Sequence, residues 1–216
     1  MNSTHRFGIA VLVVVAAGVA SLLAAPSLPD ELVVNWDSAG EPSGTMPATQ
    51  AIALVPGLMA GLLVLFAVIP RIDPLSENIA AFRPEYDWFV VVMTAFLFGI
   101  HAGVLLFNLG YEFPFIQALI PGFALVFYYT GIVLEKAERN WFVGIRTPWT
   151  LSSDQVWQQT HQLGAKLFKL TALCALVGLL FGEYAIYFLL VPALGTALVT
   201  VVYSYYCYER LEEQEE

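Results

Sequence analysis

Histidine is the side chain best suited to proton chemistry near neutral pH, and this chain has three of them. His5 stands near the N-terminus, where we expect it to be solvated. His101 lies well inside an apolar run, and an ionisable residue in that setting is a functional candidate by default. It has no acid or second histidine within one helical turn, and Asn108 follows two turns later. A packed, hydrogen-bonded histidine and a gating or proton-linked histidine both fit this pattern.

Other patterns that carry chemistry are absent from the sequence. Neither HExxH nor GxSxG occurs, and the apolar runs contain no paired carboxylates. Cys174 and Cys207 both fall in apolar runs, without metal-ligand spacing. We therefore expect no catalytic residue, no cofactor and no metal site, and we do not expect an enzyme.

The composition requires lipid as the main solvent. Hydrophobic residues make up 58% of the 216 residues and charged residues 12%, whereas soluble domains carry about 25% charged residues. A membrane-spanning helix needs about 20 apolar residues. Six stretches meet that length, and they predict an all-α polytopic membrane protein with six transmembrane helices at 7–25, 51–69, 88–107, 115–134, 163–181 and 184–206.

The first stretch is expected to be a retained helix. Its apolar run is longer than the core of a signal peptide, and Pro26 follows at once.

The positive charges predict the orientation, because cytoplasmic loops carry an excess of Lys and Arg. If the N-terminus is cytoplasmic, the segments on the cytoplasmic side hold all nine cations of the chain: Arg6, Arg71, Arg83, Lys136, Arg139, Arg146, Lys166, Lys169 and Arg210. The outer segments then hold only acids. We expect both termini on the cytoplasmic side of the cell membrane, with lipid as the first partner.

The acid excess bears on partners. The formal net charge is −9, and the chain ends in an acidic segment at 209–216 that is expected to be solvated and disordered. Bulk charge of this sign argues against direct nucleic-acid binding. The same excess suits a salt-loving organism.

Two connections are longer than turns require: the outer segment 26–48 and the inner segment 135–162. In the inner segment a fixed turn is predicted between Gly144 and Pro148, and Ser152 with Gln155 resembles a capping box that opens a helix. That helix places Trp157 and His161 on one face. We expect an amphipathic hairpin on the cytoplasmic surface, with Trp rings at headgroup depth and Arg146 facing phosphates or a partner. The alternative is a segment that only anchors helices at the interface.

The order of residues in the inner segment resembles the signature of the SdpI family, a family of membrane proteins named for the immunity and signalling protein of a bacterial sporulation-delay toxin system. The residues that carry the resemblance are Asn140, Trp141, Phe142, Gly144, Arg146, Thr147, Pro148, Trp149, Trp157 and His161. The outer segment resembles the module that precedes this signature in longer members, through Leu28, Pro29, Asp30, Trp36, Asp37, Gly40 and Pro42. Members often carry His where Asn35 stands, so the Asn gives a further reason to expect no metal in the outer loop. They often carry a basic residue where Gln162 stands, so the Gln weakens any contact with an anionic partner beside His161.

The resemblance implies two linked functions: protection against a secreted peptide toxin, and retention of a cytoplasmic repressor at the membrane. It implies an N-terminal two-helix module at 1–70 and a four-helix SdpI-like region at 71–216. The inner segment then binds the partner. Three hypotheses remain from the residues themselves: a receptor or immunity protein, a small transporter or permease subunit, and an enzyme acting on lipid. Only patterned loops, which recognition needs, are visible in the sequence; the oligomeric state is not predicted.

Overall fold

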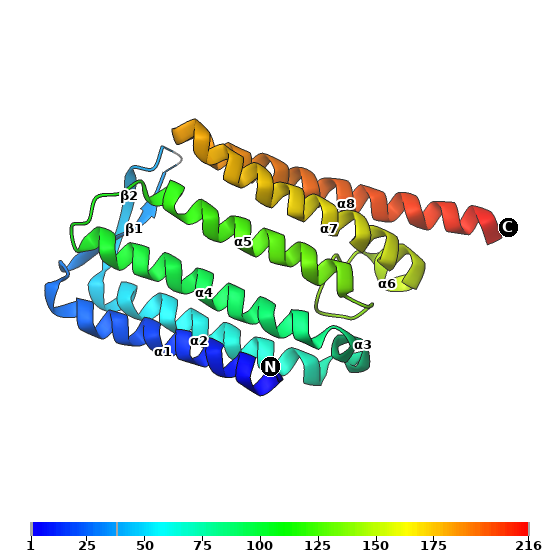
Figure 1. Ribbon diagram of the computed structural model, residues 1–216, viewed down its shortest axis with the longest axis horizontal. Helices are drawn as coiled ribbons and strands as arrows, with labels where there is room; N and C mark the ends of the chain where they lie inside the picture. Colours follow the sequence, from blue (N-terminus) through cyan, green and yellow to red (C-terminus); the bar gives the residue numbers. More distant parts are fainter. Residues whose placement is uncertain (1, 38, 216) are drawn as a thin grey trace.

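The computed structural model describes residues 2–37 and 39–215 and consists of long helices aligned in one bundle (Figure 1). The elements in chain order are α1 (Ser3–Ala24), η1 (Ala25–Ser27), β1 (Glu31–Trp36), β2 (Pro42–Pro47), α2 (Ala48–Ile72), α3 (Ser76–Ala81), α4 (Arg83–Asn108), α5 (Phe115–Lys136), α6 (Pro148–Ser152), α7 (Asp154–Gly178), η2 (Leu179–Tyr184) and α8 (Ala185–Glu215). Each of the six predicted apolar stretches falls in a long helix or its immediate continuation. The short helix α3 was not predicted.

Within the described residues, five helical stretches are long and apolar enough to cross a membrane. Four of them contain α1, α2, α4 and α5, and the fifth is the continuous stretch Asp154–Gln214. That stretch reverses direction within η2, where Gly182 has φ 57° and ψ −120°. Glycine tolerates this left-handed backbone because it has no Cβ. The chain therefore folds back, and α7 and α8 lie side by side (Figure 1).

The helices pack around α4 and α5, which contact each other. Helix α4 also packs against α1 and α2, and α5 packs against α7 and α8. Large apolar side chains stay exposed along the outer faces: Leu23 is 77% exposed and Leu180 is 83% exposed. Such faces are stable in hydrocarbon, where helices also satisfy their own backbone hydrogen bonds.

The acidic end of the chain differs from the expectation of disorder, because α8 continues to Glu215. Side chains four residues apart support its last turns. Tyr205 hydrogen-bonds Glu209, and the Arg210 guanidinium lies 5.1 Å from the Tyr206 ring centroid. Pairs at this spacing face each other on a helix and stabilise it.

The outer segment is also different from the expected loop, since it contains a two-stranded antiparallel sheet. Leu32 pairs with Met46 and Val33 with Thr45, with irregular register near Asn35. Asp37 forms the turn: its Oδ1 accepts from the N–H groups of Ala39 (2.9 Å) and Glu41 (3.0 Å). Gly40 in this turn has φ 85°. Asp commonly forms turns in which its carboxylate accepts hydrogen bonds from the backbone N–H groups that follow it.

The hairpin is attached to α4 and α5 by two side chains. Asn108 at the end of α4 accepts from the Val33 N–H (2.8 Å) and donates to the Val33 carbonyl (2.9 Å). Its side-chain amide thus makes the same two hydrogen bonds to β1 that the backbone of a neighbouring strand would make. The Trp36 ring stacks on Phe115 at 3.6 Å and meets the edge of Phe107 at 5.2 Å. The strands are thereby held on the ends of the helices.

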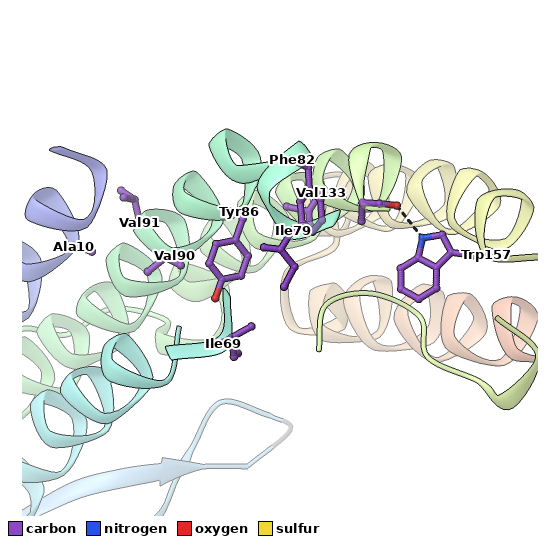
Figure 2. Close-up of a cluster of buried hydrophobic side chains, with 10 residues drawn as sticks. Ala10, Ile69, Ile79, Phe82, Tyr86, Val90, Val91, Val133 and Trp157 are labelled. Carbon is purple, nitrogen blue, oxygen red and sulfur yellow. Dashed lines mark hydrogen bonds between the residues drawn. The ribbon is translucent and has the colours of Figure 1, made fainter. Parts of the chain in front are cut away.

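Both chain ends lie at the end of the bundle opposite the hairpin, together with α3 and α6 (Figure 1). We call these the loop end and the hairpin end. A buried cluster at the loop end joins α2, α3, α4 and α5 (Figure 2). Beside it, Asp87 is fully buried and pairs with Arg83 (2.6 Å) and Arg6 (3.7 Å), which ties α1 to α4.

We predict that Asn108→Ala destabilises the protein by about 1–3 kcal/mol, because the backbone groups of Val33 lose their side-chain partner. Asn35→Ala is the matched control, since that amide is exposed on the same hairpin, and it should change stability by less than about 0.5 kcal/mol. Thermal unfolding in detergent, followed by Trp fluorescence, measures both. Equal stability of the two variants would contradict the proposed attachment.

Candidate functional site

The candidate site is the chain between α5 and α7, and its signature residues divide into a buried set and an exposed set. We name residues 137–147 the signature loop. Asn140, Thr147, Trp157 and His161 are buried, while Trp141, Phe142, Arg146 and Pro148 are exposed. Trp149 is half-buried and packs its ring on Tyr205 at 5.0 Å. The first set builds the loop, and the second set is available to a partner.

Asn140 is the centre of the signature loop. Its Oδ1 accepts from the N–H groups of Phe142 (3.0 Å) and Val143 (2.6 Å). Its Nδ2 donates to the carbonyls of Glu138 (2.9 Å) and Val143 (2.9 Å). One amide therefore satisfies four backbone groups that no helix or sheet pairs, which is what a buried irregular segment requires.

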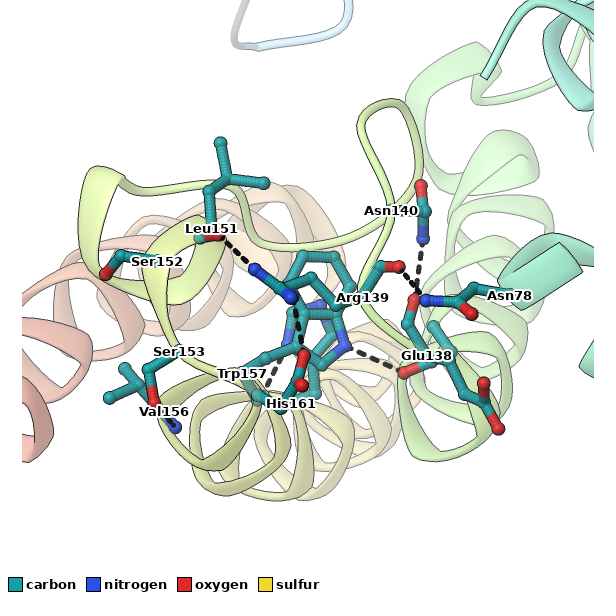
Figure 3. Close-up of polar contacts among 12 residues, drawn as sticks. Asn78, Glu138, Arg139, Asn140, Leu151, Ser152, Ser153, Val156, Trp157 and His161 are labelled. Atoms are coloured by element: carbon teal, nitrogen blue, oxygen red, sulfur yellow. Dashed lines mark hydrogen bonds and ion pairs between the residues drawn. The ribbon is translucent and has the colours of Figure 1, made fainter. Parts of the chain in front are cut away.

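Two residues from the α2–α4 connection hold the loop in place. The carboxylate of Asp73, at the end of α2, accepts from the N–H groups of Leu75 (2.7 Å) and Trp141 (3.0 Å). Asn78 Nδ2 donates to the Arg139 carbonyl at 2.6 Å (Figure 3). Sequence reasoning missed both residues. The Asp73–Pro74 pair was an available turn signal, but it does not reveal a partner 68 residues away.

Trp157 and His161 share a face of α7, as their spacing predicted, and their rings stack at 3.9 Å. Their position differs from the prediction, however, because Trp157 is only 3% exposed. Its Nε1–H donates to the Ala137 carbonyl at 2.8 Å, inside the protein (Figure 2). Trp157 is thus a buried support of the signature loop, and its ring does not lie at a lipid headgroup.

The two ring nitrogens of His161 have opposite partners. Nδ1 lies 2.8 Å from the Trp157 carbonyl, which only accepts, and Nε2 accepts from the Ile145 N–H at 3.0 Å. Only the neutral tautomer with the proton on Nδ1 satisfies both contacts. His161 therefore orders the backbone at Ile145.

Gly144 allows this contact. Its φ is 124°, and a Cβ at this position would overlap His161 Nε2 and lie 3.1 Å from Trp157 Cη2. Gly is required here both by the backbone conformation and by the closeness of the rings.

The rest of the segment forms short capped helices, so the predicted amphipathic hairpin is wrong in detail. Thr147 and Thr150 form the capping box of α6, with Pro148 at its first position. Ser153, and not Ser152, caps α7 by accepting from the Val156 N–H. Thr147 also donates to Ser204 of α8 at 3.0 Å. The segment is a cap over the bundle, because its backbone is tied to three helices rather than to lipid alone.

A charged pair closes the cap. Arg139 Nε lies 2.5 Å from the Asp154 carboxylate, and its Nη1 donates to the Leu151 carbonyl at 2.7 Å (Figure 3). Next to this pair is a polar cavity of about 420 Å³ between the end of α5 and the start of α7. Trp157, His161 and Asn78 lie in its wall.

The exposed set is concentrated on the outer side of the loop. Trp141 is 52% exposed and Phe142 is 37% exposed, although their backbone N–H groups are held by Asp73 and Asn140. Arg146 is exposed, and its Nη1 donates to the Phe142 carbonyl at 3.2 Å. A rigid pair of aromatic rings next to a cation suits recognition of a protein or of lipid.

The outer residues and the two intramembrane residues have structural partners. Pro29 and Asn35 are exposed, Asp37 and Gly40 form the turn, and Trp36 packs on the helices. Asn108 holds β1, as described above. Within the residues that the structure describes, no group of three His, Cys, Asp or Glu side chains could hold a metal ion.

His101 has a partner that the sequence did not reveal. Ser21 of α1 donates to the Ile52 carbonyl of α2 (2.7 Å), and its Oγ lies 2.8 Å from His101 Nε2. These contacts connect α1, α2 and α4.

The long apolar helices and the capped loop define the class: a multi-pass membrane protein. Residues 136–204 match the SdpI/YfhL protein family, and residues 12–60 match a domain of unknown function (DUF1648). The chain is 23% identical over 204 residues to "Immunity protein SdpI" of Bacillus subtilis (strain 168), which covers 94% of this chain and 96% of that relative. The resemblance to the SdpI family seen in the inner segment is confirmed by the family match over residues 136–204. No solved structure matches it.

We predict that Gly144→Ala disrupts the signature loop, because it combines backbone strain with overlap of His161. Gly110→Ala is the matched control: Gly110 also has a positive φ (92°), but no atom lies within 4 Å of its added Cβ. The control should lose about 1–3 kcal/mol from strain alone. Gly144→Ala should lose about 1–3 kcal/mol more from overpacking. Unfolding in detergent measures the difference, and equal losses would show that the His161 contact is unimportant.

Proposed function

We propose that this protein is a membrane immunity and signalling protein. In this proposal the hairpin end meets a secreted peptide toxin, and the exposed residues of the signature loop hold a cytoplasmic repressor at the membrane. The supporting observation is that Asp73 and Asn140 hold the backbone N–H groups of Trp141 and Phe142, and that Arg146 bonds the Phe142 carbonyl. A segment that only anchored helices would need aromatic rings, but it would not need this backbone network.

The proposal includes six spans with both termini in the cytoplasm. Gly182 would place the fifth turn of the chain at the membrane surface, so that α7 and α8 cross separately. The support is electrostatic: Arg71, Lys136 and Arg146 belong to the loop end, while Asp37 and Glu41 belong to the hairpin. Cations are retained on the cytoplasmic side during insertion.

The hairpin suits a peptide with positive charge. Asp30, Glu31, Asp37 and Glu41 are exposed on or beside its strands, and residues 26–48 contain neither Lys nor Arg. Opposite charge increases the rate of encounter and disfavours partners of the wrong sign.

Two continuous routes link the hairpin to the signature loop. Strand β2 leads directly into α2, and α2 ends at Ile72, next to Asp73, which holds Trp141. Trp36 stacks on Phe115 at the start of α5, and α5 leads into the loop at its other end. Toxin that bound one arrangement of these helices more tightly would shift the population towards it.

The proposed units are residues 1–70, which receive the toxin, and residues 71–216, which present the partner surface. Helix α4 belongs to the second unit but packs against α1 and α2 of the first. It is therefore the element through which the two units contact each other most directly. The polar cavity beside Trp157 and His161 offers space for a side chain of the repressor.

Topology is tested with reporters in intact cells. A tag after Glu216 and a tag in the turn at Gly40 should be labelled from opposite sides: the first only after permeabilisation, the second without it. Labelling of the Glu216 tag in intact cells would place the signature loop outside and would contradict the proposed partner.

Function is tested by survival of a toxin-sensitive host that expresses the chain beside a producer of its co-encoded secreted peptide. Arg146→Ala should abolish protection or repressor recruitment, because it removes the exposed cation of the loop. Trp36→Ala should weaken both, because it loosens the hairpin from α5.

Arg71→Ala is the matched control, since Arg71 is another exposed arginine at the loop end that bonds a carbonyl of its own helix. It should keep wild-type protection and recruitment. Membrane abundance is measured for each variant. Full activity of Arg146→Ala at normal abundance would refute the assigned surface.

A further inference from the structure

An apolar pocket of about 250 Å³ lies beside the signature loop, on another side from the polar cavity. Helices α2, α4, α5 and α7 form its walls through side chains such as Phe66, Phe89, Val133 and Phe168. Residues 142–145 of the signature loop close one end. The pocket therefore joins both units of the chain to the loop that we assign to partner binding.

The polar groups in the lining are already satisfied. Tyr86 donates to the Phe66 carbonyl at 2.6 Å, and Thr130 donates to the Val126 carbonyl at 2.8 Å. An occupant thus finds apolar surface and hydroxyl groups that need no further acceptor. Burying a polar group there without a partner would be unfavourable, so the lining selects hydrocarbon.

The depth of the pocket restricts where that hydrocarbon comes from. Phe66, Ile69 and Phe168 fall inside the apolar stretches 51–69 and 163–181, whereas Phe142 and Ile145 lie outside any such stretch. The pocket therefore extends across the boundary between the hydrocarbon layer and the headgroups. A soluble partner would not reach its deeper part, but a lipid has the right chemistry at both depths.

A cation stands at the headgroup side. Arg146 is exposed and donates to the carbonyl of Phe142, a residue of the lining. Within residues 2–37 and 39–215, no ion pair engages Arg146, whereas Arg83, Arg139 and Lys169 pair with carboxylates. Its guanidinium is available for a phosphate, with which arginine forms strong charge-assisted hydrogen bonds.

We propose that this pocket binds an anionic phospholipid of the leaflet at the loop end, with one acyl chain between α2 and α7 and the phosphate at Arg146. The lipid would fill the space behind Phe142 and Ile145 and stabilise the conformation of the signature loop. Arg146 also belongs to the proposed partner surface, but lipid binding is measured on the purified chain without toxin or repressor. Its failure is therefore distinguishable from failure of the proposed immunity function.

Native mass spectrometry of the full chain in detergent, titrated with dioleoyl phosphatidylglycerol, tests the proposal. The wild type should retain one lipid per chain. Thr130→Phe fills the pocket from α5 and should abolish that binding. Arg146→Gln should weaken it about fivefold, as expected for one cation near a membrane surface. Phosphatidylcholine should bind more weakly than phosphatidylglycerol, because its headgroup has no net charge.

Two controls separate the site from ordinary lipid contact. Val199→Phe adds a ring to an exposed position of α8, and Arg71→Gln removes a cation from the other side of α2; both should bind like the wild type. Unchanged lipid binding in Thr130→Phe, or equal losses in the controls, would overturn the proposal. A lipid-free dimer in place of a lipid-bound monomer would assign the pocket to a second copy of the chain and would also overturn it.

Discussion

Between α5 and α7 the backbone leaves helical geometry at the edge of a bundle whose surroundings are largely hydrocarbon. Unpaired N–H and C=O groups are unfavourable in such a place, because little water is available to bond them. Side chains supply the missing partners: Asn140 pairs four backbone groups, His161 pairs Ile145, and Asp73 pairs Trp141. The arrangement of the signature loop depends on these bonds.

The same requirement explains why the signature combines such different residues. Gly144 is needed because the rings of Trp157 and His161 approach its backbone closely. Thr147 caps α6 and reaches Ser204 of α8. The backbone that carries the exposed residues Trp141, Phe142 and Arg146 is held in this way, which lowers the backbone entropy lost when a partner binds.

The bundle places this loop at one end of helices whose other ends hold the β-hairpin. Asn108 and Trp36 fasten the hairpin to α4 and α5, and Asp73 fastens α2 to the loop. In the proposed function, a displacement of the hairpin reaches the loop through these packed helices, because close-packed interiors transmit strain. The apolar pocket lies where α2 and α7 meet the loop, so an occupying lipid would act on the same elements.

The sequence by itself determined those features that depend on local properties of the chain. Runs of about 20 apolar residues predicted where the long helices lie, and the spacing of four placed Trp157 and His161 on one face. The order of residues at 139–161 showed the resemblance to the SdpI family. The tertiary structure alone decided which of those residues are buried, that the outer segment pairs as a hairpin, and that Asp73, Asn78 and Ser21 are partners of the loop and of His101. The hydrogen bonds of Asp73, Asn78 and Ser21 to these partners join residues 61 to 80 positions apart. Hydrophobic length and helical periodicity are read within a few turns of chain, but a hydrogen bond between distant segments exists only after the helices have packed.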